Sequence, residues 1–253
     1  MTRVLSNFEA RTLQTLELVS CPQLHVPPII QSFHQLANFK ILSSNVTSWD
    51  VDAALTAANH PRLISFAAYN VNMPGGELPL GMQDPHFPPT LRTLHLSGMN
   101  VQTLPVTFPS MWPQAMFLMY EFCNLTVVPP VLTRMSSMVL SLAGNQLTDV
   151  PPELFYVMPL MNLDLSGNPL TNLPEIPASL IAQLGHPAPI LYVLDLMYTR
   201  LESLPSWFSS LYRVKASFTP LCTKVMSGEL SVIPLGSSPF YLDCVSADEI
   251  GMG

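Results

Sequence analysis

Charged residues are scarce in this sequence, and long apolar runs are missing. Asp, Glu, Lys and Arg make up 11% of the 253 residues, the net charge is −7, and the ten basic residues form no cluster. Binding of nucleic acid through phosphate contacts depends on clustered Lys and Arg, so nucleic acid is not expected as a partner. No run of 18 apolar residues occurs, so no segment of this chain is predicted to span a membrane.

Signatures of catalysis are also missing. The sequence contains no phosphate-binding loop, no nucleophile elbow and no kinase signature. The six histidines have no metal-ligand spacing, and His95 is better interpreted as a contact residue on a binding surface. We therefore expect no cofactor and no metal, and we do not expect an enzyme.

A repeated leucine pattern dominates what is present, and it is clearest between Leu160 and Pro174. Leu163 and Leu165 should point to one side of a short strand, because strand side chains alternate with a period of two. The chain is expected to turn at Asn168, after which further leucines return to the same core. A unit of this kind cannot bury its leucines alone, so similar units should stack beside it.

Similar units occur along most of the chain. One chance match to such a pattern is common, but nine in phase are not. Several copies end in Leu-Pro or Val-Pro, as Leu104-Pro105 and Val150-Pro151 do. The nine copies begin 20 to 31 residues apart, at Leu13, Leu36, Leu63, Leu91, Ala115, Ser137, Leu160, Leu191 and Leu211.

This pattern resembles the leucine-rich repeat superfamily over residues 13–222, and its Leu/Val-Pro endings are similar to the typical class of repeat. The resemblance implies an α/β solenoid of horseshoe shape, with a parallel sheet on the concave face and loops or short helical turns on the convex face. A repeat array needs no internal boundary. The expected organisation is an N-terminal flank (1–12), the array (13–222) and a C-terminal cap (223–253), with a short helix over residues 178–184.

The four cysteines fall into two kinds. Cys21 and Cys123 occupy the turn position that asparagine holds in other repeats, where a small donor is needed, so we expect them to be buried and inert. Cys222 and Cys244 flank the tail, and the segment ending at Cys222 resembles the closing segment of extracellular leucine-rich repeat domains. The alternatives are a disulfide that pins the cap, worth roughly 3 kcal/mol on the entropic model, and two free thiols in a reducing compartment.

Two triplets match the N-glycosylation pattern. They begin at Asn45 and Asn124, and both overlap the turn region of a repeat, where the asparagine could instead serve the fold. Three-residue matches arise often by chance, so these two sites are weak candidates.

Side chains between the strand leucines are expected to face the concave surface. In the middle and later repeats many of these are aromatic residues or methionine, and a contiguous exposed apolar strip usually marks a binding surface. We therefore predict recognition of a protein or peptide ligand on this face. The predicted contact residues are Phe117, Met119, Phe122, Tyr192, Met197, Tyr198 and Tyr212.

Two alternative functions are kept. The first is the ligand-sensing ectodomain of a membrane receptor, possibly kinase-linked, of which this chain would be a fragment at the cell surface. The candidate disulfide and the glycosylation triplets favour it, whereas the absence of a signal-peptide core in residues 1–9 opposes it. Either the protein is cytoplasmic, or this chain is a piece of a longer one. The second is a carbohydrate-active enzyme using Asp164 and Asp195, which should lie at the same level on adjacent strands, roughly 5 Å apart.

Overall fold

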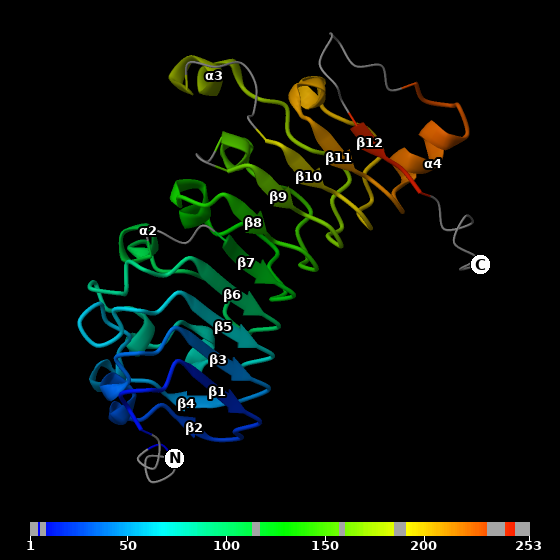
Figure 1. Cartoon of the computed structure of the whole chain (residues 1–253). Coiled ribbons are helices and arrows are strands. Elements are labelled where there is room, and N and C mark those ends of the chain that lie inside the picture. The colour runs from blue at the N-terminus through cyan, green and yellow to red at the C-terminus, as the bar shows by residue number, and fades with distance from the viewer. Residues whose placement is uncertain are drawn as a thin grey trace. The chain divides into compact units, whose positions relative to one another are not determined.

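A computed structural model describes residues 5, 9–112, 117–156, 160–184, 191–231 and 241–245 (Figure 1). The chain divides into two compact units. Unit 1 consists of Met1–Asn124 and Pro129–Ser137, and unit 2 consists of Leu125–Val128 and Met138–Gly253. The repeat pattern of the sequence runs through both units without marking this division.

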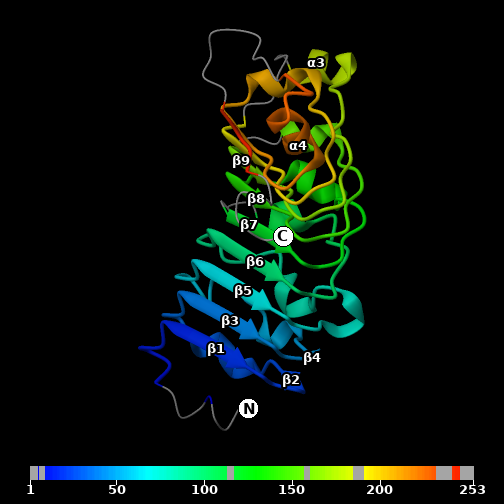
Figure 2. The same ribbon diagram turned by 90° about the vertical axis from the view of Figure 1, so that its right-hand side faces the viewer.

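Unit 1 is built on a parallel sheet with the strand order β1-β3-β5-β6-β7 (Figure 2). A second, two-stranded parallel sheet joins β2 and β4. The strands are β1 (Thr15–Val19), β2 (Leu24–His25), β3 (Asn38–Leu42), β4 (Val46–Ser48), β5 (Ser65–Tyr69), β6 (Thr93–Ser97) and β7 (Phe117–Glu121).

Short helical turns connect these strands. Most begin at or just after proline, which fixes φ for the first turn and lacks the N–H that would be unpaired there. In unit 1 they are the 3-10 turns η1 (Pro28–Ser32), η2 (Val51–Ala53), η3 (Pro74–Gly76), η4 (Leu80–Met82) and η5 (Pro130–Arg134), with the short helix α2 (Phe108–Met111).

Unit 2 repeats the arrangement with shorter strands. Its strand pairs β8-β9, β9-β10, β10-β11 and β11-β12 are all parallel. The elements are β8 (Val139–Ser141), η6 (Pro152–Tyr156), β9 (Asn162–Asp164), α3 (Ala178–Leu184), β10 (Val193–Asp195), η7 (Ser206–Ser210), β11 (Arg213–Lys215), α4 (Pro220–Met226) and β12 (Tyr241–Asp243).

Alternation along most strands separates the core from the outer face of the sheet. In β7, Leu118 and Tyr120 are buried, whereas Phe117, Met119 and Glu121 lie on the outer face. The buried Tyr120 hydroxyl donates to the carbonyl oxygen of Val101 at 2.6 Å, so a tyrosine is tolerated at a leucine position. The outer side of each sheet, which the sequence predicts as the concave face, is called the sheet face below.

The turn after most strands contains a small side-chain donor, whereas buried Val71 and Met99 hold this position after β5 and β6. Asn145 donates to the carbonyl of Leu142 and Asn168 to that of Leu165, both at 2.9 Å. The same position is filled by Ser44, Cys123, Thr199 and Thr219, each of which donates to a carbonyl of its own turn. The prediction of an inert, buried Cys123 agrees with this structure, but Cys21 is only partly buried.

The residue before this position has a left-handed backbone in the nine repeats that carry β1, β3 and β5 to β11. Glycine is favoured there because other residues pay a steric cost at positive φ. Three repeats instead carry a bulky aromatic residue. The nine residues are Ser20, Ser43, Asn70, Gly98, Phe122, Gly144, Gly167, Tyr198 and Phe218, with φ between 46° and 66°.

The predicted fold class is confirmed, and so is the short helix over residues 178–184. The tail differs from a simple cap, because β12 continues the sheet of unit 2 in register with β11. Its Tyr-Leu-Asp triplet repeats the Asn-Leu-Asp of β9 and the Val-Leu-Asp of β10. The predicted repeat start at Ala115 lies outside the described residues.

Candidate functional site

The predicted contact residues fall in both units. Phe117, Met119 and Phe122 belong to unit 1 and are exposed or partly exposed. The other four, Tyr192, Met197, Tyr198 and Tyr212, belong to unit 2. Unit 2 carries the more organised set, because its aromatic residues pair with one another at both ends of the strands.

A row of tyrosines lies at the start of the strands β10 to β12. The rings of Tyr192 and Tyr212 stack with centroids 4.4 Å apart and planes 9° from parallel. Tyr241 extends the row, with its centroid 5.3 Å from that of Tyr212. A hydrogen bond between the Tyr192 and Tyr212 side chains raises the pKa of Tyr212. Tyr192 and Tyr241 are about half exposed, at 47% and 52%.

The repeat pattern did not identify Tyr241 in advance. Tyr241 opens β12 and lies 28 residues after Arg213, the residue that opens β11. The two preceding repeats, which start at Leu191 and Leu211, are only 20 residues apart. The one sequence signal for this strand was the Tyr-Leu-Asp triplet, which matches the triplets of β9 and β10.

A second aromatic pair lies beyond the other end of the strands. Tyr198 follows β10 and Phe218 follows β11, and their rings stack with centroids 4.5 Å apart and planes 9° from parallel. Both residues occupy the left-handed position, with φ of 59° and 63°. Bulky residues in this conformation are rare and strained, and such strain concentrates at functional sites. Tyr198 is 58% exposed.

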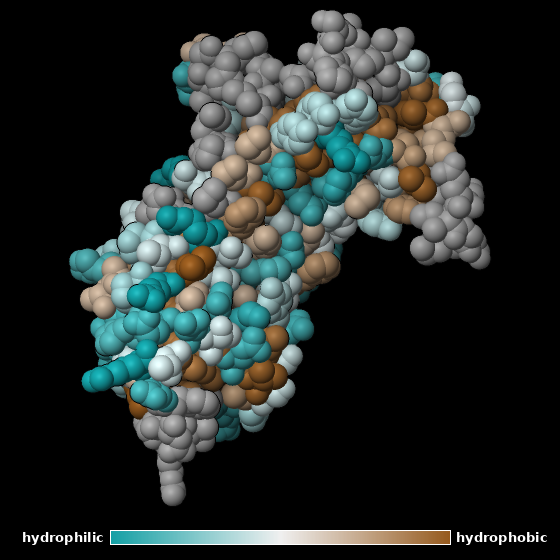
Figure 3. Space-filling model, in the orientation of Figure 1, coloured by the Kyte–Doolittle hydropathy of each residue, from teal (hydrophilic) through white to brown (hydrophobic). Residues whose placement is uncertain are grey.

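Ion pairs lie between the two aromatic pairs. Lys215 Nζ is 3.0 Å from Asp195 Oδ2, and Arg213 Nε is 2.6 Å from Asp243 Oδ2. The hydrogen bond to Asp243 raises the pKa of Arg213. Hydrophilic and hydrophobic residues accordingly alternate over this part of unit 2 (Figure 3).

The two aspartates considered for catalysis lie where the sequence predicts them. Asp164 and Asp195 are register partners on β9 and β10. Asp195 is nevertheless buried, and its two oxygens accept from the Met197 N–H and from Lys215. An aspartate held in this way stabilises the turn and is poorly placed to exchange protons with a substrate. Among the described residues, no group of three or more His, Cys, Asp or Glu is placed to hold a metal ion.

The sheet face of unit 1 is more polar. His95 connects Tyr69 and Glu121, because its Nδ1 lies 2.8 Å from the Tyr69 hydroxyl and its Nε2 lies 3.1 Å from Glu121 Oε2. Burial raises the pKa of Tyr69. Met119 is the register partner of His95, so this polar chain borders the predicted contact residues of unit 1.

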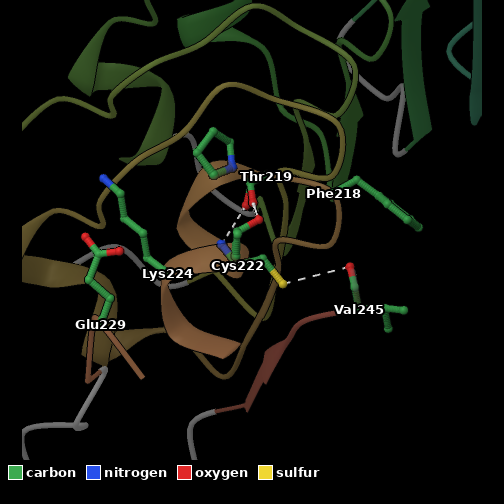
Figure 4. Close-up of a pocket in the computed structure, with 8 residues that line it drawn as sticks. Phe218, Thr219, Cys222, Lys224, Glu229 and Val245 are labelled. Carbon is green, nitrogen blue, oxygen red and sulfur yellow. Dashed lines mark hydrogen bonds between the residues drawn. The ribbon is translucent and has the colours of Figure 1, made fainter. Parts of the chain in front are cut away.

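Cys222 and Cys244 are joined by a disulfide in the structure, with Cα atoms 5.4 Å apart. Cys222 lies on α4, whose N-terminus is capped by the Thr219 hydroxyl accepting from the Cys222 N–H at 3.1 Å. A cavity of about 620 Å³ adjoins the bridge, and Figure 4 shows Cys222 directed toward the Val245 carbonyl. The cavity is lined by Phe218, Thr219, Cys222, Lys224, Glu229 and Val245, among others.

The two glycosylation candidates are both exposed, but they differ in local structure. Asn45 Nδ2 donates to the carbonyl of Pro22 at 3.2 Å, so this side chain already serves the fold. Asn124 has a left-handed backbone with φ of 56°. Both sites stay predictions.

Comparisons with known proteins agree with the fold. Residues 159–180 match the model of the Leucine Rich Repeat family. A search of curated proteins finds no significant match. Within the described part of the chain, no helix reaches the length and apolarity that crossing a bilayer requires.

Solved structures share the fold at low sequence identity. A leucine-rich repeat protein of Leptospira interrogans has a TM-score of 0.62 at 19% identity, over 95% of this chain and 58% of that one. The Toll–Spatzle complex of Drosophila has a TM-score of 0.57 at 19% identity, over 89% of this chain and 31% of that one. The TLR13–ssRNA13 complex has a TM-score of 0.60 at 19% identity, over 82% and 28%.

The matched repeat and the parallel-sheet architecture agree on the fold: residues 159–180 match one leucine-rich repeat, and the chain has the fold of solved leucine-rich repeat structures. It spans about three tenths of the Toll and TLR13 chains that it matches.

Proposed function

We propose that this chain recognises a protein or peptide ligand, with the principal contacts on the sheet face of unit 2. The observation that carries the proposal is the pair of aromatic stacks, Tyr192–Tyr212 and Tyr198–Phe218, at opposite ends of β10 and β11. Tyrosine supplies a large contact area and a hydrogen-bonding hydroxyl, and it is enriched at protein interfaces.

The strain at Tyr198 and Phe218 supports the same proposal. Glycine occupies the equivalent position at Gly144 and Gly167 in the same unit, so the turn itself does not need an aromatic side chain. A left-handed backbone costs a non-glycine residue about 1–2 kcal/mol. Two neighbouring repeats both have an aromatic residue in this strained conformation, and the two rings stack on each other. Ligand contact explains this arrangement better than a requirement of folding does.

The composition argues for a protein ligand over nucleic acid. The chain has a net charge of −7, and a phosphate backbone would be repelled by it. Two of the four basic residues of unit 2, Arg213 and Lys215, already form ion pairs on this sheet face.

The proposal is tested by panning a random phage-displayed peptide library on the full chain and measuring the affinity of selected peptides for variants. Tyr192→Ala should weaken binding about 30-fold, which corresponds to roughly 2 kcal/mol for a central aromatic contact. The control is Glu153→Gln on η6, whose side chain is exposed and lies off the sheet. If selected peptides bind Tyr192→Ala and Tyr198→Gly as tightly as the parent, the binding surface lies elsewhere.

A second candidate function is the ligand-sensing ectodomain of a membrane receptor. The Cys222–Cys244 bridge favours it, because disulfides persist in oxidising compartments outside the cytosol. A full-length transcript that encodes a signal peptide before residue 1 and a membrane span after residue 253 would support this role. A transcript that ends at these residues would refute it.

The carbohydrate-active enzyme is not favoured, because Asp195 is committed to Lys215 and to the turn. An Asp164→Asn, Asp195→Asn double variant should therefore leave glycan turnover unchanged. A loss of turnover on replacing both carboxylates would restore this alternative.

A further inference from the structure

The first of the two N-glycosylation triplets is committed to the fold. Asn45 Nδ2 donates to the Pro22 carbonyl at 3.2 Å. The Thr47 hydroxyl donates to the Leu24 carbonyl, also at 3.2 Å. Thr47 lies within β4, which pairs with β2. The amide and the hydroxyl of this triplet therefore both hold the chain to the preceding repeat.

The second triplet, Asn124-Leu125-Thr126, makes no such contacts. Asn124 and Thr126 are both exposed, and neither side chain forms a hydrogen bond within the described part of the chain. Leu125 between them is buried, and its N–H donates to Asn145 Oδ1 at 3.1 Å. The anchored Leu125 thus leaves an amide and a hydroxyl exposed on either side of it.

A substitution in the strand explains why the Asn124 amide is not needed by the fold. In the preceding repeat Asn100 holds the equivalent position, and its side chain bonds the N–H and the carbonyl of Met73 at 2.7 and 3.0 Å. The corresponding carbonyl for Asn124 is that of Val101, which accepts from the Tyr120 hydroxyl at 2.6 Å. The Tyr120 hydroxyl therefore supplies the link between repeats that an asparagine amide supplies elsewhere.

An exposed aromatic ring lies two residues before this asparagine. Phe122 is 60% exposed and forms no ring contact with the residues that the structure describes. Phe122 and Asn124 both have a left-handed backbone, with φ of 52° and 56°. Bulky residues are rare in this conformation, and such strain concentrates at functional sites. In the first triplet the residue at the same distance from the asparagine is Ser43.

We propose that Asn124 carries an N-linked glycan whose first sugar packs against the Phe122 ring, and that Asn45 is not modified. A pyranose ring has a face of C–H groups, and the negative face of an aromatic ring attracts such positively polarised hydrogens. The inference is independent of the proposed ligand. It assigns Phe122 to the glycan instead of to a ligand of unit 1.

The modification requires an oligosaccharyltransferase and a lipid-linked oligosaccharide as the sugar donor. Asn124 Nδ2 forms a bond to the anomeric carbon of the first sugar and loses one proton. The bond from that carbon to the pyrophosphate oxygen breaks, and the lipid pyrophosphate leaves. The Cys222–Cys244 bridge supports passage through a compartment where this transfer occurs, because disulfides form and persist in the lumen of the secretory pathway.

The test is peptide mapping by mass spectrometry of the full chain from its native source, before and after treatment with peptide-N-glycosidase. The parent should carry sugar at Asn124 and none at Asn45. Thr126→Val keeps Asn124 but breaks its triplet and should lose the glycan, whereas Thr126→Ser should retain it. The matched control, Thr47→Val, breaks the other triplet and should leave the glycan in place. An unmodified Asn124, or a glycan at Asn45, would overturn the inference.

Phe122→Gly tests the packing of the first sugar. Enzymatic removal of the glycan should lower the melting temperature of the parent, and it should lower that of Phe122→Gly by less, because the variant has no ring for the sugar to cover. In the deglycosylated protein the same substitution removes only backbone strain. Phe117→Ala removes another exposed ring, from the start of β7, and should respond to deglycosylation as the parent does. Equal shifts in the parent and in Phe122→Gly would overturn the assignment of Phe122 to the glycan.

Discussion

Tyr198 and Phe218 stack almost parallel, with ring centroids 4.5 Å apart, although each lies at a backbone position that favours glycine. Phe122 occupies the equivalent position in unit 1, where it is 60% exposed and forms no ring contact with the described residues. Comparing Phe122 with Tyr198 and Phe218 therefore distinguishes the free-energy cost of the left-handed backbone from the free energy gained by ring stacking.

Replacing Phe122 by Gly should raise the free energy of unfolding by about 1 kcal/mol, because it removes backbone strain without breaking a stack. Tyr198→Gly relieves similar strain but loses a ring pair worth about 0.5–1.5 kcal/mol, so its stability should stay within about 1 kcal/mol of the parent. Urea denaturation measures both. A large loss of stability in Tyr198→Gly alone would assign the Tyr198–Phe218 pair a structural role.

Leu165→Ala should destabilise the protein by about 2–5 kcal/mol, because Leu165 is fully buried in the core of unit 2. The loss should extend to neighbouring repeats, since each repeat is supported by the next. The control is Val127→Ala, because Val127 belongs to the same unit and is 70% exposed. Equal denaturation midpoints for the two variants would contradict the assigned repeat register.

The stability of unit 1 should fall as the pH drops below about 6.5, because of His60. This residue is fully buried, and burial lowers its pKa from the ordinary value of 6.5, with His34 adding to the effect. Its Nδ1 accepts from the Thr56 N–H at 3.3 Å, and its Nε2 lies 3.0 Å from the Ile30 carbonyl. Protonation of Nδ1 would make it a donor that faces the Thr56 N–H, so two donors would lie opposite each other without an acceptor between them.

The sign follows from proton linkage. Below pH 6.5 the unfolded chain binds a proton on His60 more readily than the folded chain, so acid favours unfolding. His60→Gln should lower the melting temperature at pH 7.5 and reduce the further loss between pH 7.5 and 5.5. The exposed His86→Gln serves as the matched variant. An unchanged acid-induced loss in His60→Gln would contradict this role.

Thiol titration should distinguish the four cysteines. The Cys222–Cys244 bridge closes a loop with a sequence separation of 22 residues, and its reduction should lower stability by roughly 3 kcal/mol. Cys123 is buried, and this burial raises its pKa to about 11, so folded protein at pH 8 should not be alkylated there. Partly buried Cys21 should react first. Four reactive thiols in protein from its native compartment would contradict the bridge.

The repeat core was predictable because its signal is local and periodic. The positions of Leu163, Leu165 and Asn168 follow from strand alternation and turn chemistry, and the register of Asp164 with Asp195 follows from stacking equal repeats. The pairing of Asp195 with Lys215 could have been read in the same way, because the two hold equivalent strand positions.

The arrangement of the aromatic rings could not be predicted from the repeat pattern. The repeat pattern places Tyr192 and Tyr212 between two core positions of their repeats, but the angle between two rings depends on side-chain torsions that the pattern does not contain. Tyr241 was missed because an irregular spacing separates it from β11. The division into two units was also not visible, because it depends on contacts that uniform leucine positions do not distinguish.

Two buried asparagines of unit 2 each accept a hydrogen bond from the backbone of the preceding repeat. Asn145 Oδ1 accepts from the Leu125 N–H at 3.1 Å, and Asn168 Oδ1 accepts from the Leu147 N–H at 3.0 Å. In both cases the asparagine completes a loop of the repeat that precedes it. A ribosome makes the N-terminal repeat first, so each of these loops obtains its last hydrogen bond only after the following repeat has been synthesised, and folding trails the growing chain by one repeat.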